Sequence, residues 1–304
     1  MVPPNPVIMR LIVLFVLCFW AAGCGRGPDR SNQVTDDLGR TVYLSSVPTR
    51  VVTLAPSVTE IVFAAGAGSL IAGVTDADDF PPEVDNLPRF SALPVDFEVV
   101  LSLEPDLALA SDQVNSPNDA ATLEAVGVPV YFFSVSRLED IARTIRDAGA
   151  LLNTASAADQ LADSLTRSLA QLRVLTEELE ERPSTLFLIS DVTLYAFGQG
   201  SYIHDMIALA GGSSITVDLE SRSPVLTDEF VLFEQPEVIL GAFGSGYLPT
   251  SLLEYHPTWD VVPAVTGGRV YGVPADRYLR PGPRLVTGAW EMARLLHPGL
   301  VPAQ

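Results

Sequence analysis

Residues 155–182 read ASAADQLADSLTRSLAQLRVLTEELEER and contain neither glycine nor proline. Leucines recur here at spacings of four, four, three and seven, which places them on one face of an α-helix. A helix of roughly 26 residues spans about 39 Å, longer than most globular helices. A coiled coil is the alternative, but the leucine stripe lasts under four heptads. We therefore expect one rigid helix over residues 154–182, stopped by Pro183, that joins two lobes.

On both sides of this helix, short apolar runs alternate with helical patterns. This alternation predicts α/β lobes with mainly parallel sheets flanked by helices, an N-terminal lobe over residues 36–153 and a C-terminal lobe over 183–304. Ser57 or Thr59 is the expected N-cap of the first helix, and Ser136 with Glu139 forms the expected capping box of a later one. The expected strands of the first lobe are 50–55, 71–74, 107–110 and 128–133, and the expected helices are 57–67, 96–103, 118–125 and one ending near 152.

One sequence pattern occurs once in each lobe. Glu98 stands seven residues before Pro105, and Glu229 stands seven residues before Pro236. An acidic residue and a strand follow each proline. The pattern predicts a duplicated unit; the alternative is two independent helix–loop–strand segments that each favour Glu in the first helical turn.

Composition excludes several classes of protein. The chain of 304 residues has 18 Lys plus Arg against 37 Asp plus Glu, a formal charge of −19. This balance argues against nucleic-acid binding through phosphate neutralisation. With 48% hydrophobic residues, the chain has ample material for a core. Both cysteines fall within the first 24 residues, so we expect no disulfide and no thiolate metal site in the folded part.

The N-terminus predicts export. Residues 11–20 are wholly apolar, about half of what a membrane span needs, so residues 1–23 are expected to be a signal peptide. The small residues before Cys24 resemble the bacterial lipobox, with Ala21 where Leu is usual. We expect Cys24 to be lipidated, holding the protein to a membrane outside the cytoplasm, and residues 24–35 to be a flexible tether. An uncleaved anchor and a plain secretory signal are the alternatives.

Several motifs together resemble the extracytoplasmic binding proteins of ABC importers for vitamin B12, iron siderophores and haem. They include residues 50–60 (RVVTLAPSVTE), 79–82 (DFPP), 198–206 (GQGSYIHDM) and 281–284 (PGPR). The resemblance covers about residues 42–298. It implies two α/β lobes joined by one long helix, with transmembrane importer subunits as partners. It also implies that Glu98 and Glu229 dock onto arginines of those subunits, which suits carboxylates because arginine binds them bidentately.

The cleft between the lobes is the expected ligand site, because open α/β sheets bind ligands beyond the carboxyl ends of their strands. Aromatic density with few polar groups suits a large, flat or greasy ligand. Candidate contacts are the residues expected in the loops at those strand ends. They are Ala55, Ser57, Asp79, Phe80, Tyr195, Phe197, Phe243, Tyr247, Arg277, Tyr278 and Arg280.

The turn at residues 79–82 resembles the cobalamin-binding branch, where an Asp-Tyr-Pro-Pro turn brings its aromatic to the corrin. Phe80 keeps the ring here and lacks the hydroxyl, and residues 91–94 (SALP) lack the tryptophan that cobalamin binders often carry. Arg277 and Arg280 could instead grip carboxylates of a siderophore or of haem, or pair with surface acids. A corrinoid is the expected ligand, and a ferric siderophore or haem the alternative.

Two other classes fit less well. A secreted hydrolase would need a nucleophile motif, and the chain has no Gly-x-Ser-x-Gly and no His-Glu-x-x-His. A zinc or manganese binder would need convergent ligands, whereas His204, His256 and His297 are scattered. We expect His204 to cap or be partly buried, and the other two to sit in turns. The sequence thus predicts a monomeric binding protein that is not an enzyme and has no cofactor or bound metal.

Overall fold

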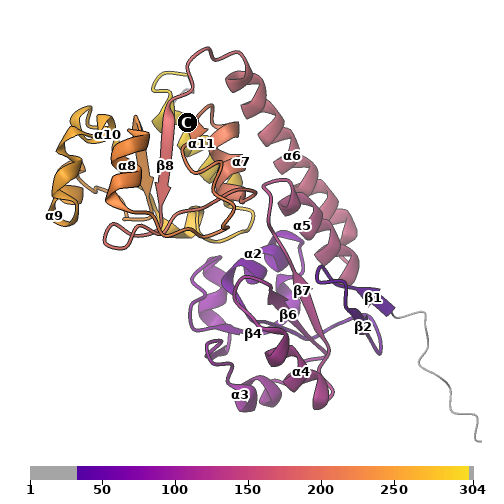
Figure 1. The fold of residues 1–304 in the computed structure, drawn as a ribbon. Helices are drawn as coiled ribbons and strands as arrows, with labels where there is room; N and C mark the ends of the chain where they lie inside the picture. Colours follow the sequence, from indigo (N-terminus) through magenta and orange to yellow (C-terminus); the bar gives the residue numbers. More distant parts are fainter. Residues whose placement is uncertain (1–32, 301–304) are drawn as a thin grey trace, which may run out of the picture.

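The computed structural model describes residues 33–300. Figure 1 shows two α/β lobes, one above the other, with the long helix α6 (Ala155–Glu177) running along one side of both. In lobe one the sheet order is β5-β4-β3-β6-β7, with every pair parallel. Its strands are β3 (Val51–Thr53), β4 (Ile71–Thr75), β5 (Arg89–Phe90), β6 (Leu107–Ser111) and β7 (Val130–Phe133). Its helices are α2 (Pro56–Ala64), α3 (Phe97–Ser102), α4 (Pro117–Ala125) and α5 (Asp140–Leu151).

Lobe two has a parallel sheet in the order β11-β10-β8-β9. Its strands are β8 (Ser184–Leu188), β9 (Ser213–Ser214), β10 (Val238–Gly241) and β11 (Val270–Gly272). Its helices are α7 (Tyr202–Leu209), α8 (Asp228–Glu234), α9 (Leu252–Tyr255), α10 (Pro263–Thr266) and α11 (Leu285–Leu296). Short 3-10 segments in the two lobes are Gly68–Leu70, Pro82–Asn86, Pro249–Ser251, Pro257–Val261 and Ala275–Arg277.

The two lobes repeat one unit, as the sequence pattern predicts. The order β4-β3-β6-β7 in lobe one matches β9-β8-β10-β11 in lobe two when strands are paired by chain position. The residue before each proline of the pattern, Glu104 or Gln235, is left-handed with φ of 48°. The acid after each proline accepts a backbone N–H at the start of the neighbouring strand segment: Asp106 from Thr49 at 2.8 Å, and Glu237 from Ser184 at 2.8 Å.

Helix α6 is shorter than the sequence predicts, since it ends at Glu177 and not near residue 182. Acidic residues at positions 177, 178, 180 and 181 oppose the negative end of the helix dipole, which favours this earlier stop. Arg182 then satisfies the helix end by donating to the carbonyl of Thr176 at 3.2 Å. Of the leucine stripe, Leu172 is fully buried, and Leu165 and Leu169 pack partly buried against the same core.

One hydrophobic core runs through both lobes and α6. It contains Ile141 of α5, Leu172 of α6 and Ile207 of α7, together with residues of both sheets. Two smaller cores cover the other faces of the sheets, one in each lobe. Because core packing is dense and resists deformation, this shared core holds the lobes in a fixed relation.

Two helix starts differ from the sequence expectation. Pro56 begins α2 and Ala55 is its N-cap without a side-chain bond, so neither Ser57 nor Thr59 caps it. Proline is well suited to this first position because it lacks the N–H that would be unpaired. The expected capping box of Ser136 and Glu139 is also absent. The Asp140 carboxylate instead accepts the N–H of Ser136 at 3.0 Å, and α5 begins at Asp140.

The described chain begins with a hairpin of β1 (Gln33–Thr35) and β2 (Thr41–Tyr43). The expected tether therefore gives way to a strand at Gln33, before its expected end at residue 35. Asp36 forms the turn by accepting the N–H of Arg40 at 2.8 Å. The expected signal peptide and Cys24 lie outside the described residues. Within residues 33–300, no helix is long and apolar enough to cross a membrane.

Candidate functional site

The loops after the strands of both sheets meet between the lobes. Asp79, after β4, pairs with Arg280, after β11. Loops after β6 and β7 of lobe one also face the loop after β8 of lobe two across a cavity of about 280 Å³. The carboxyl ends of both sheets therefore border one inter-lobe cleft, as expected for a ligand site on open α/β sheets. The cavity is lined by Gln113, Val135, Ser136, Phe197, Gly200, Ser201, Tyr202, Arg222 and Ser223.

A cluster of charged side chains joins the lobes at this cleft. Glu60 of α2 is only 3% exposed and faces Arg284 of lobe two. The Arg284 guanidinium donates Nη2 to Glu60 Oε1 at 2.6 Å and Nε to Oε2 at 2.9 Å. Arg284 also pairs with Asp276, and Arg280 lies 3.8 Å from Glu60. This bidentate pair has the geometry in which arginine binds carboxylate most strongly.

Burial and ion pairing shift the pKa values of the acids in this cluster in opposite directions. Burial raises the pKa of Glu60, and the hydrogen bond and charge of Arg284 partly offset that rise. Asp79 is more exposed, and its hydrogen bond from Arg280 lowers its pKa. The buried Glu60–Arg284 pair therefore depends on both partners, since removing one would leave a buried charge uncompensated.

Exposed aromatic rings lie on loops of both lobes that border the cleft. The Phe80 side chain is 40% exposed, and the Arg284 guanidinium lies 4.4 Å from its ring centre. Tyr195, in the loop after β8, is 46% exposed. Exposed aromatics on opposite lobes can hold a flat ligand by stacking.

The other expected aromatic contacts are more deeply packed. Phe197 is half-buried against Phe187 and Tyr202, with ring centres 5.9 and 5.5 Å away, and lines the cavity. Phe243 packs on Tyr247 at 4.5 Å. The Tyr247 hydroxyl donates to Asp191 Oδ2 at 2.8 Å, and burial, followed by this bond, raises the pKa of Tyr247.

Four of the expected ligand contacts are buried or paired within their own lobe in this structure. Tyr278 has no exposed surface because its ring packs on Phe187, with centres 5.6 Å apart. Ala55 is also fully buried, as the residue that begins α2. Arg277 turns back into its own lobe and pairs with Glu291 of α11. Ser57 is nearly buried where α2 approaches residue 282 of lobe two.

Sequence reasoning missed several residues of the cleft. Glu60 and Arg284 lie within the motifs at 50–60 and 281–284, but nothing in either motif shows that they pair across lobes. Arg222 was missed because its segment has no clear periodicity. Within residues 33–300, the Arg222 side chain has no hydrogen-bond or ion-pair partner.

The expected docking glutamates occupy equivalent helix positions. Glu98 is the second residue of α3, whose N-cap Asp96 accepts from Val99 N–H. Glu229 is the second residue of α8, whose N-cap Thr227 accepts from Phe230 N–H. Both carboxylates are exposed, and backbone and Thr227 hydrogen bonds lower the pKa of Glu229.

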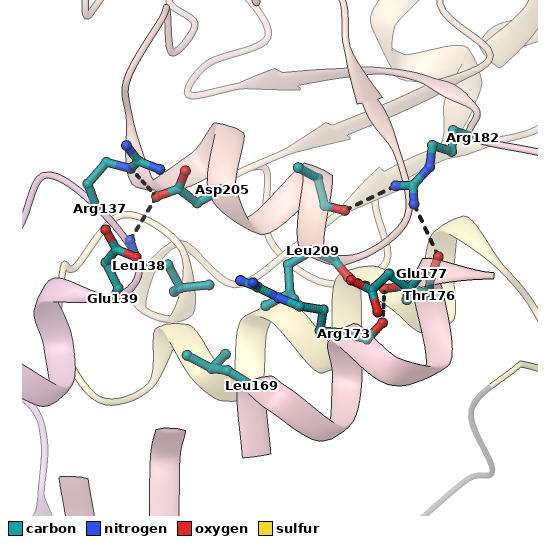
Figure 2. A pocket seen from close by; sticks show the side chains of 11 residues that line it. Arg137, Leu138, Glu139, Leu169, Arg173, Thr176, Glu177, Arg182, Asp205 and Leu209 are labelled. Carbon is teal, nitrogen blue, oxygen red and sulfur yellow. Dashed lines mark hydrogen bonds and ion pairs between the residues drawn. The ribbon is translucent and has the colours of Figure 1, made fainter. Parts of the chain in front are cut away.

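A second inter-lobe cavity, of about 340 Å³, has a different character. Figure 2 shows its lining, which comes mainly from residues 137–139 just before α5, from the C-terminal part of α6 and from α7. Arg137 of lobe one donates to Asp205 of lobe two at 2.8 Å, and this contact adds another tie between the lobes. The three arginines of its lining are balanced by three acids, and it contains none of the expected ligand contacts. The candidate ligand site is therefore the inter-lobe cleft at the carboxyl ends of the two sheets.

The described part of the chain contains no group of three or more His, Asp or Glu arranged to hold a metal ion. His204 lies half-buried in α7 and its Nε2 is 3.0 Å from the Thr216 hydroxyl. His297 ends α11. His256 is buried between α9 and the 3-10 segment at Pro257–Val261.

Comparison with known proteins agrees with this arrangement. The family model described as "Periplasmic binding protein" matches residues 51–277. The chain belongs to this family. Its members are extracytoplasmic binding components of ABC importers and do not act as enzymes. The family and the fold expected from the sequence are thereby confirmed.

Two curated relatives cover most of the chain. An uncharacterized ABC transporter substrate-binding lipoprotein, YvrC of Bacillus subtilis, is 26% identical over 94% of this chain and 95% of its own length. The vitamin B12-binding protein of Vibrio cholerae is 28% identical over 81% of this chain and 88% of its own.

Two solved structures share the fold. The periplasmic vitamin B12 binding protein BtuF of Vibrio cholerae has a TM-score of 0.72 and 27% identity, covering 82% of this chain and 97% of its own. The periplasmic heme-binding protein RhuT of Roseiflexus sp. RS-1 has a TM-score of 0.73 and 26% identity, covering 83% and 99%. Proteins with similar sequence identity to this chain are thus named for different ligands.

Proposed function

We propose that this periplasmic binding protein delivers a corrinoid to an ABC importer. The observation that carries the proposal is a pair of exposed aromatic rings on loops that border the cleft, Phe80 in the loop after β4 and Tyr195 in the loop after β8. A corrinoid is a flat macrocycle, and stacking on rings suits it. Relatives named for vitamin B12 binding support the choice, since they match over four fifths of the chain. Asp79, Phe197, Phe243, Tyr247 and Arg280 complete the proposed contacts, with Ser57 behind them.

Haem is the second candidate, because the haem binder RhuT is similar to this chain at 26% identity. A haem site would favour free cations for the two carboxylates of that ligand. Arg280 and Arg284 already pair with Asp79, Glu60 and Asp276, which argues for a ligand with mostly neutral side chains. Arg222 is the unpaired cation of the cavity, and it suits a single anionic group such as the phosphodiester of cobalamin.

Titration of the purified protein with cyanocobalamin, hemin and a ferric siderophore tests the ligand. We expect calorimetry to show saturable cyanocobalamin binding at or below tens of micromolar. Absent cyanocobalamin binding together with tight hemin or siderophore binding would move the assignment to that ligand and leave the family unchanged.

The proposal includes the position of the protein in the cell and its partner. We propose that lipid on Cys24 tethers the mature protein, which acts as a monomer, to the membrane. Cys24→Ser should release it from the membrane fraction; a variant that stays membrane-bound with its full N-terminus would contradict lipidation. Glu98 and Glu229 are the proposed docking points for arginines of the transmembrane subunits.

A further inference from the structure

A chain of hydrogen bonds in lobe two begins at the buried side chain of His256. Its ring is stacked on Trp259, with centres 4.4 Å apart and planes 20° apart. Its Nδ1 lies 2.7 Å from Asp228 Oδ1, and its Nε2 lies 2.9 Å from the carbonyl oxygen of Asp191. The two ring nitrogens thus each face an oxygen atom, one on a carboxylate and one on a backbone carbonyl. His256 is 6% exposed, whereas the side chain of its partner Asp228 is 37% exposed.

The two ends of this hydrogen-bonded path lie in regions with different proposed roles. Asp228 is the first residue of α8 and directly precedes the docking candidate Glu229. Asp191 lies in the loop after β8, and its carboxylate accepts the hydroxyl of Tyr247 at 2.8 Å. Tyr247 packs on Phe243 in the loop after β10, among the proposed ligand contacts. A path therefore leads from the proposed ligand contact Tyr247, through Asp191 and His256, to the start of α8.

Lobe one has no equivalent connection. There the docking helix α3 begins at Phe97, which offers no charged or polar side chain at the position of Asp228. Its N-cap Asp96 bonds within its own helix, accepting from Val99 N–H at 3.1 Å. The duplicated unit thus carries this path in lobe two and not in the described part of lobe one.

We infer that His256 is a positioning residue that couples the cleft loops to helix α8, so that ligand contact at Tyr247 alters how α8 presents Glu229. The inference rests on the proposed docking role of Glu229. The physical basis is a set of partly buried hydrogen bonds joined through Asp191 and His256, in which breaking one bond shifts the partners of the next. Through this coupling, an importer could distinguish ligand-bound from ligand-free protein by its contact with lobe two.

The coupling is tested first without ligand or importer, by hydrogen–deuterium exchange of the α8 amides. Tyr247→Phe removes one hydroxyl at the cleft end of the path. We expect it to speed exchange in α8 by about three- to tenfold, the range for loss of one hydrogen bond. In a His256→Phe background, which keeps an aromatic ring on Trp259, Tyr247→Phe should have no further effect on α8.

Asp228→Ala provides a second background, because it cuts the same path at its other end and leaves the N-cap Thr227 in place. If His256→Phe does not fold, this variant decides the question alone. Glu229→Ala is the matched control: it changes the neighbouring residue without touching the path, so the effect of Tyr247→Phe should persist. The inference would be overturned if Tyr247→Phe changed α8 exchange equally in the parent, His256→Phe and Asp228→Ala backgrounds. It would also be overturned if Tyr247→Phe left α8 exchange in the parent unchanged.

Cyanocobalamin then serves as the ligand probe. We expect it to slow exchange of α8 in the parent and to leave α8 unchanged in His256→Phe and Asp228→Ala, while α3 serves as an internal reference. Protection of α8 that survives in both variants would overturn the role in ligand sensing. Failure of cyanocobalamin to bind at all would count against the proposed ligand, and the ligand-free comparison would still decide the coupling.

Discussion

Two aromatic side chains near the cleft, Phe80 and Tyr195, are 40% and 46% exposed without ligand. A ligand stacked on them would cover that surface, so each substitution to Ala should weaken cyanocobalamin binding by about 1 to 3 kcal/mol. Calorimetry measures the difference. Tyr43→Ala is the control, because Tyr43 is also an exposed aromatic residue, at 55%, and lies on β2 outside the cleft loops. Unchanged affinity in both cleft variants would place the ligand elsewhere.

Asp79 gives a pH dependence with a definite sign. Its hydrogen bond from Arg280 lowers its pKa below the ordinary value of 3.8. The folded state therefore releases this proton more readily than the unfolded chain, so the pair stabilises the protein above that value. The contribution is lost as the pH falls through the folded pKa.

The melting temperatures of the parent and Asp79→Asn should consequently differ at pH 6 and converge as the pH falls through the lowered pKa of Asp79. Exposure of Asp79 keeps the difference small. Asp260→Asn is the reference, because Asp260 is exposed and has no ion pair within residues 33–300. If the difference in melting temperature between the parent and Asp79→Asn were constant with pH, the Asp79–Arg280 pair would not stabilise the fold through its charge.

Helix α6 sets the spacing of the lobes, and its exposed middle can be altered without touching the core. Gln171→Pro removes a helical hydrogen bond and clashes with the preceding turn, which costs about 3 kcal/mol or more. We expect a lower melting temperature and a larger radius of gyration in small-angle X-ray scattering, with Gln171→Ala as the matched control. A scattering profile identical to the parent would mean that the spacing of the lobes does not depend on an intact α6.

The elements show how far sequence reasoning reaches. The leucine spacing located α6, and the repeated Glu and Pro positions located α3 and α8, because these patterns are local. The sequence does not locate the end of α6 or the start of α5. Asp140 stands beside the similar Glu139, and the bond of Arg182 back to Thr176 depends on how the chain turns after the helix.

The site was less predictable than the elements. Loop position nominated Phe80 and Tyr195, which are exposed, but also Tyr278, which is buried against Phe187. The side of a loop that a ring faces depends on packing that no spacing encodes. The Glu60–Arg284 pair could not be predicted either, because its residues are more than two hundred positions apart and meet only when the lobes are assembled.

For the whole molecule, the two exposed glutamates form the proposed contact with the importer. Replacing Glu98 and Glu229 together by Ala should abolish import in a reconstituted system and change ligand affinity by less than about twofold, because neither carboxylate lies in the cleft. Glu124→Ala, on α4 of lobe one, is the control for loss of surface charge. Retained import by the double variant would remove the docking assignment.

The buried Glu60–Arg284 pair has a kinetic consequence. Together with α6 it ties the lobes at two separate places, so opening the cleft widely would break a buried charge pair. Binding should then be a single bimolecular step. In stopped-flow absorption experiments, the observed rate should rise linearly with cyanocobalamin concentration, and a plateau would reveal a slow closing step. The time needed to load the protein would then be set by how often a ligand molecule meets the cleft.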